Sequence, residues 1–110
     1  MPRERDTASQ NALKGVQLNN EGAALEKAGD LRGALEKYRA ALTLYPDHTG
    51  IRANYAVALL KLGHWTEGIA ELREAIRRDP HNATLQRALA DALAQAPPGA
   101  DAGRAQPKPE

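Results

Sequence analysis

The sequence predicts an all-α protein, an α-solenoid of five helices in which antiparallel helix pairs stack side by side. The stretch from Gly29 to Pro46 returns thirty-four residues later as Gly63 to Pro80, with large and small apolar residues at matching positions. Each copy opens on a glycine, which allows a turn that a side chain would hinder, and closes on a proline, which ends a helix. A period of this length is typical of one supersecondary unit that is used more than once.

The period also extends upstream of each glycine, so each unit holds two helices. Asn20 matches Asn54, and Leu25 matches Leu59, at the same separation. The first helix of a third unit follows the second proline, but its second half is missing because Pro97 ends it. We therefore expect a disordered lead-in over residues 1–11, a repeat domain over 12–96 and a disordered tail or linker over 97–110. Within the domain we expect repeat 1 at about 15–48, repeat 2 at about 49–82 and a capping helix at about 83–96.

Each expected helix has an apolar stripe and a start signal. The first is expected to begin near Asn11. Asp30, Thr66 and Asn82 are candidate N-caps for the second, fourth and fifth helices, because their side-chain oxygens can accept from unpaired backbone N–H groups. Apolar residues at helical spacing form one face of each helix. The main ones, in chain order, are Leu13, Val16, Leu18 and Leu25; Leu31, Leu35, Tyr38 and Leu42; Ile51, Tyr55 and Leu59; Trp65, Ile69, Leu72 and Ile76; and Leu85, Leu89 and Leu93.

The matched positions resemble the tetratricopeptide repeat family over about residues 15–96. The family's small residue, where the paired helices touch, falls on Gly22, Ala56 and Ala90, and its closing proline falls on Pro46 and Pro80. The resemblance implies two full repeats and a C-terminal capping helix. It also implies a scaffold that binds other proteins.

The chain departs from the family pattern at three positions of the first helices. Arg52 and Gln86 stand where a bulky apolar residue is usual, and Glu21 stands where the family prefers leucine. We expect local packing to differ at these positions while the fold stays the same.

Composition and charge exclude several classes of protein. The chain is 42% hydrophobic and 4% aromatic, with a net charge of +1, so no bulk attraction to nucleic acid or to an anionic membrane is expected. No apolar run approaches the ~20 residues of a membrane span, and the charged first residues do not form a secretory signal. The absence of cysteine fits a reducing compartment. We expect a cytoplasmic protein that binds neither nucleic acid nor membrane.

No group of residues predicts catalysis or a metal site. His48, His64 and His81 fall in turns of successive repeats, which lie about 10 Å apart and are poorly placed to share one ion. We expect them to be solvent-exposed turn residues. Arg73, Arg77 and Arg78 form a basic spot on the fourth helix. It is interrupted by Glu71 and Glu74, and it lacks exposed aromatics for base stacking. Without a nucleophile–base pair or a phosphate loop, we expect no enzyme activity and no cofactor.

The resemblance places the functional surface on the first, third and fifth helices, which line a concave groove in this family. Asn54 is the strongest candidate, because its amide offers a donor and an acceptor to a peptide backbone; a hydrogen bond between helices is an equally weighted alternative. Val57 and Leu60 form either an apolar floor or a contact with a neighbouring helix. The candidate groove residues are Asn19, Ala23, Glu26, Asn54, Val57, Leu60, Lys61, Arg87 and Asp91.

One type of ligand is disfavoured by the groove positions. Repeats that hold the acidic C-terminal tails of Hsp70 and Hsp90 use Lys, Asn, Asn, Lys and Arg. The corresponding residues here are Asn19, Ala23, Asn54, Thr84 and Ala88, of which only Asn54 matches. Since a double carboxylate would lack charge-assisted partners, we expect no tight binding of such tails.

Three functions follow as alternatives. The first is a non-catalytic module that binds a peptide or a partner protein. The second is a regulatory or substrate-binding segment of a larger enzyme, with the proline-rich end at 106–110 as a linker. The third is a self-associating scaffold, a weak homodimer through the fifth helix, because two and a half repeats are near the lower limit for a stable stack.

Overall fold

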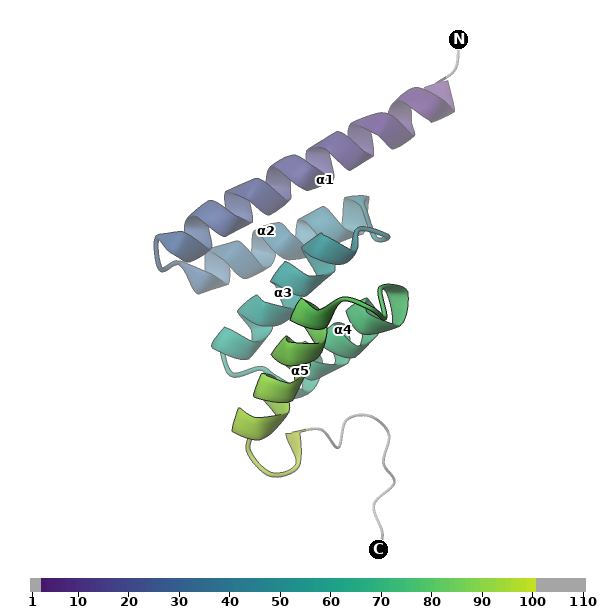
Figure 1. Ribbon diagram of the computed structural model, residues 1–110. Helices are drawn as coiled ribbons and strands as arrows, with labels where there is room; N and C mark the ends of the chain where they lie inside the picture. Colours follow the sequence, from purple (N-terminus) through teal and green to yellow (C-terminus); the bar gives the residue numbers. More distant parts are fainter. Residues whose placement is uncertain (1–2, 101–110) are drawn as a thin grey trace, which may run out of the picture.

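The computed structural model describes the backbone of residues 3–100 and the side chains of residues 7–100. Within these residues it has five helices and no strand, which confirms the all-α prediction. The helices are α1 (Arg3–Lys27), α2 (Leu31–Leu44), α3 (Thr49–Lys61), α4 (Trp65–Arg78) and α5 (Ala83–Gln95). They stack in chain order, with α1 and α2 as one antiparallel pair, α3 and α4 as the next, and α5 as a lone last helix (Figure 1). None of these described helices is both long and apolar enough to cross a lipid bilayer.

The two helix pairs share one turn geometry. Gly29 and Gly63 have φ angles of 93° and 85°, in the left-handed region that favours glycine. The residue after each glycine donates its N–H to a carbonyl five residues earlier, at 2.8 Å in both turns. This bond closes a helix C-terminus of the Schellman type. The sequence repeat is therefore a structural repeat at the level of individual hydrogen bonds.

Two of the predicted N-caps are confirmed. Asp30 Oδ1 accepts a hydrogen bond from the Gly33 N–H at 2.9 Å, and Asn82 Oδ1 accepts from the Leu85 N–H at 3.1 Å. Each satisfies one of the backbone donors that the first turn of a helix leaves unpaired.

At the starts of α3 and α4, two residues have roles that differ from the expectation. His48 is half-buried and caps α3, because its Nδ1 accepts from the Ile51 N–H at 3.1 Å. The prediction of an exposed turn residue is therefore wrong for His48. The predicted cap Thr66 lies inside α4, which begins one residue earlier, and its hydroxyl donates to the Ala100 carbonyl at 2.6 Å. The segment after α5 therefore turns back against α4.

The core consists of two clusters between successive layers of the stack. The first joins α2 and α3 through Ala34, Leu35, Tyr38, Tyr55, Ala58 and Leu59. The second joins α3, α4 and α5 through Ala56, Ile69, Leu72, Ala75, Leu85 and Ala92. Many of these residues are alanine, so the helices approach closely and the core is thin.

Glycines allow close approach in both helix pairs, on the first helix of one pair and on the second helix of the other. A Cβ at Gly22 of α1 would lie 2.8 Å from the Tyr38 ring and 3.2 Å from the Ala34 carbonyl of α2. In the second pair the glycine is Gly68 of α4, where a Cβ would lie 3.2 Å from the Ala56 carbonyl of α3. The close approach leaves no space for side chains on both helices at the crossing.

Helix α1 begins at Arg3, so the predicted start near Asn11 is wrong. The side chains from Thr7 to Gln10 are all exposed, which is why no apolar pattern marks this part of the helix. Its residue types include good helix formers, and lengthening a helix that is already packed needs no new nucleus. At the other end, residues 101–110 of the predicted disordered tail lie outside the described residues.

Candidate functional site

The first contact on the candidate groove joins α1 to α3. Asn54 Nδ2 donates a hydrogen bond to Asn19 Oδ1 at 3.0 Å, and both side chains are half-buried. The structure thus contains the hydrogen bond between helices that was one of the two expectations for Asn54. The bond uses one of the two amide protons of Asn54 and leaves its carbonyl oxygen able to accept another.

The second contact is centred on Glu26 of α1. Its Oε1 accepts from the Tyr38 hydroxyl at 2.7 Å, and its Oε2 forms an ion pair with Lys61 Nζ at 2.5 Å. Burial acts to raise the pKa of Glu26, but the hydrogen bonds from Lys61 and Tyr38 and the charge of Lys61 outweigh it, so the pKa lies below the ordinary 4.5. Burial and the Glu26 carboxylate both raise the pKa of Tyr38. One carboxylate therefore connects α1, α2 and α3.

A cleft of about 390 Å³ lies farther along the same surface, between α3 and α5. Four of the candidate groove residues, Val57, Leu60, Lys61 and Asp91, line it together. The remaining lining residues are Trp65, Ala88, Ala92 and Gln95. The cleft has an apolar floor and a polar rim, which is the usual composition of a site that binds a side chain or a short peptide.

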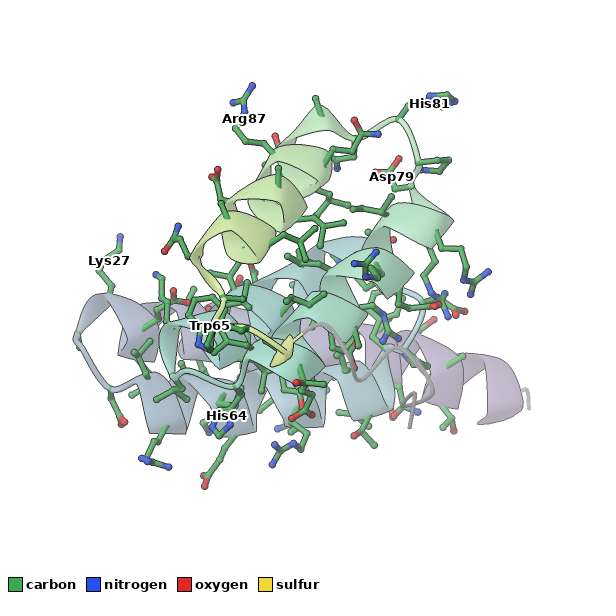
Figure 2. All side chains as sticks on the ribbon, turned by 90° about the horizontal axis from the view of Figure 1, so that it is seen from below. Lys27, His64, Trp65, Asp79, His81 and Arg87 are labelled. Carbon is green, nitrogen blue, oxygen red and sulfur yellow. The ribbon has the colours of Figure 1, made fainter. Side chains whose placement is uncertain are left out.

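Five of the nine candidate residues do not line this cleft: Asn19, Glu26 and Asn54 form the contacts described above, and Ala23 and Arg87 remain. Ala23 lines a shallow hollow on α1 together with Asn20, Ala24, Lys27 and Ala28. Arg87 is exposed, does not line the cleft, and points away from the helices (Figure 2). The structure therefore brings together Val57, Leu60 and Lys61 of α3 with Asp91 of α5, whereas Ala23 and Arg87 are not part of this lining.

Trp65 is the site residue that the sequence interpretation missed. It was assigned to the inner stripe of the fourth helix, but as the first residue of α4 it is half-buried and lies beside the C-terminal end of α5 (Figure 2). Its position directly after the Gly63 turn could have indicated a role at the rim, because residues at the start of a helix are covered by few neighbours. No other lining residue of this cleft is aromatic.

Two basic residues of α4 are paired with acidic groups. Arg77 and Arg78 both pair with Glu74 at 2.7 Å, and Arg78 also pairs with Asp47 at 3.3 Å. The basic spot on α4 is therefore largely paired with acidic groups. No group of three His, Cys, Asp or Glu side chains that could hold a metal ion occurs in the part of the chain that the structure describes.

Comparison with known proteins agrees with this geometry. A sequence profile of the tetratricopeptide repeat family matches residues 25–92, and the chain belongs to this family. Its repeats generally mediate contacts between proteins and are generally non-catalytic. The resemblance seen in the sequence is confirmed.

The curated relatives are longer proteins. DnaJ protein P58IPK homolog B of Oryza sativa subsp. japonica is 31% identical, over 84% of this chain and 23% of the relative. TPR repeat-containing thioredoxin TTL4 of Arabidopsis thaliana is 32% identical, over 67% of this chain and 11% of the relative. BBSome complex member bbs-4 of Caenorhabditis elegans is 33% identical, over 56% of this chain and 13% of the relative. This chain thus spans less than a quarter of each of these proteins.

Proposed function

We propose that this chain is a non-catalytic module that binds an extended peptide, or an extended segment of a partner protein, across α1, α3 and α5. The observation that supports this proposal is the cleft of about 390 Å³ with its apolar floor and its polar rim. The family membership supports the same conclusion. The proposed activity requires no cofactor, and a cytoplasmic location remains a prediction.

The polar residues of the groove suggest how the peptide is held. The Asn54 carbonyl oxygen, which the bond to Asn19 does not use, can accept from a peptide N–H. The cleft then takes one side chain of the peptide. Three helices about 10 Å apart span about 20 Å, which accommodates about six extended residues. An interface of this size predicts weak, micromolar-class binding.

A random-peptide display selection tests the proposal. The cleft variant is Ala88→Glu, which places a larger charged side chain at the lining, and the matched control is Ala40→Glu on the exposed surface of α2. We expect the unmodified chain and the control to enrich the same peptides and the cleft variant to lose them. Equal enrichment by the cleft variant would contradict the proposal.

A second function is favoured by the lengths of the relatives. Because the curated relatives are at least four times as long, this chain also suits a regulatory or substrate-binding segment of a larger enzyme. An immunoblot of native lysate against an epitope in residues 31–61 tests this. A band well above 11.8 kDa under denaturing conditions supports it, and a band at 11.8 kDa excludes it.

Self-association through the fifth helix stays a prediction with a simple test. Leu93 of α5 is 40% exposed, and its neighbours Ala90 and Ala94 are exposed as well. Sedimentation equilibrium of the unmodified chain and of Leu93→Lys at high concentration separates the cases. If the unmodified chain is a dimer and Leu93→Lys is a monomer, self-association through α5 is supported. If the unmodified chain is a strict monomer, the prediction is wrong.

A further inference from the structure

The cleft between α3 and α5 has one carboxylate that no cation neutralises. Lys61, the basic residue of the lining, is already paired with Glu26 at 2.5 Å. Asp91 stands at the exposed rim and makes no ion pair or hydrogen bond among residues 7–100. Arg87 lies one turn earlier on α5, and no ion pair joins it to Asp91 among the side chains that the structure describes. The charge available to a ligand in this cleft is therefore negative.

The cleft also contains an aromatic ring, that of Trp65. Trp65 is half-buried at the start of α4 and lines the same cleft as Asp91. An indole face attracts a cation, and it does so more strongly than the ring of Tyr or Phe. The rest of the floor is aliphatic, with Val57, Leu60 and Ala88, and can cover the methylene groups of a long side chain.

We propose that the cleft binds the side chain of an arginine in an extended peptide, with the guanidinium between the Trp65 ring and the Asp91 carboxylate. This inference rests on the proposed peptide-binding function and names the side chain that the groove selects. A guanidinium suits the site because it is planar, stacks on aromatic faces and can give a carboxylate two hydrogen bonds. A neutral side chain of the same shape would leave Asp91 without a partner.

Trp65 provides a direct measurement, because it is the single tryptophan of the chain. We would titrate its fluorescence with two acetylated, amidated hexapeptides that differ at one position, Ac-Gly-Ala-Arg-Leu-Ala-Gly-NH2 and the same peptide with citrulline, the neutral isostere of arginine. We expect the arginine peptide to shift the emission and to bind about tenfold more tightly than the citrulline peptide. The variant Asp91→Asn should remove this preference by weakening the arginine peptide alone.

The control is Glu36→Gln, which removes one negative charge from the exposed surface of α2 and should leave both affinities unchanged. Circular dichroism checks that each variant keeps its helices. Equal affinity of the arginine and citrulline peptides, or an Asp91→Asn variant that keeps the preference, would overturn the inference.

The display selection separates this inference from the proposed function. If the selected peptides require an intact cleft but contain no enriched arginine, the groove binds peptides and the arginine inference is wrong. If no peptide is enriched and neither hexapeptide shifts the Trp65 emission, both proposals fail together.

Discussion

Arg52 and Gln86 occupy the same position in successive repeats, and each donates a hydrogen bond to the carbonyl of the proline six residues before it. Arg52 Nη2 lies 3.1 Å from the Pro46 oxygen, and Gln86 Nε2 lies 2.6 Å from the Pro80 oxygen. These are two of the positions at which the family usually has a bulky apolar residue. This hydrogen bond explains the polar replacements. It links the turn between repeats to the helix that follows the turn.

Arg52 has a second partner that Gln86 lacks, and this difference gives the first prediction. Arg52 Nη1 pairs with Glu71 at 2.7 Å, with the side chains only 15% and 24% exposed. We expect Arg52→Gln to lose the ion pair, keep the bond to Pro46 and lower the free energy of unfolding by about 1 kcal/mol. Arg52→Ala should lose both and cost about 2 kcal/mol. Urea denaturation measures both, and equal losses would show that the bond to Pro46 contributes nothing.

The crossing of α1 and α2 gives the second prediction. Replacing a helical glycine by alanine normally stabilises a helix by about 1 kcal/mol. At Gly22 we expect the opposite sign, a loss of about 1–3 kcal/mol, because the new Cβ would lie 2.8 Å from the Tyr38 ring. Thermal or urea unfolding measures the change. A stabilised Gly22→Ala variant would show that the helices can separate without cost.

A double-mutant cycle identifies the clash as the cause. In the second repeat the corresponding residues are Ala56 and Leu72, which are both buried in the core. In a Tyr38→Leu background, Gly22→Ala should cost less than in the unmodified chain, because the ring atoms nearest the new Cβ are gone while the contact with the Ala34 carbonyl remains. Strictly additive effects of the two substitutions would indicate that Tyr38 is not what the new methyl group meets.

The histidine cap of α3 gives the third prediction. His48→Ala removes the acceptor for the Ile51 N–H and should lower the free energy of unfolding by about 1 kcal/mol. His48→Asn should keep most of the stability, because Asn82 caps α5 in the same way from the equivalent position. Urea denaturation of the two variants should separate them. An asparagine variant as unstable as the alanine variant would point instead to the ring contact of His48 with Tyr45, whose centroids are 5.0 Å apart.

The lowered pKa of Glu26 gives the fourth prediction. A carboxyl group whose pKa is lower in the folded than in the unfolded state contributes stability above its unfolded pKa, and this is lost as pH falls through the folded value. Stability of the unmodified chain should therefore fall as the pH drops below the ordinary 4.5 of Glu26. Glu26→Gln should be less stable near neutral pH, with a shallower loss on acidification. Urea midpoints across this range measure the two slopes, and equal slopes would contradict the prediction.

Most of the fold could be predicted because its determinants recur within one chain. A left-handed glycine, a capping side chain and a small residue at a helix crossing can each be recognised from the residue type at one position. Where the same type recurs thirty-four residues later, the two positions support each other. Asp30 and Asn82 were identified from their side-chain chemistry alone, since their counterparts in the other repeat are His64 and His48. His48 was not, because histidine is an uncommon cap and its role depends on which ring nitrogen faces the backbone. The first turns of α1 were missed because the side chains from Thr7 to Gln10 are exposed and show no periodic apolar residues.

The site was predicted less completely than the fold. The family pattern places Val57, Leu60, Lys61 and Asp91 on the groove, and the structure gathers them around one cleft. Which polar groups are already used by neighbours depends on side-chain contacts across helices, as for Lys61 with Glu26. The period carries no information on such contacts. The sequence period also could not indicate that the Arg87 side chain points away from the helices and does not line the cleft.

The exposed side of α1 bears on whether copies of this chain could assemble into fibres. In α3, Tyr55 and Ala58 pack on the preceding helix α2, and thirty-four residues earlier their counterparts on α1 are Glu21 and Ala24. Glu21 forms an ion pair with Lys37 at 3.1 Å, and the side chains of Lys37 and Glu21 are 41% and 44% exposed. Stacking another molecule head to tail on this face would force the carboxylate out of water. Glu21 thus acts against open-ended polymerisation, a hazard of any fold that grows by repetition.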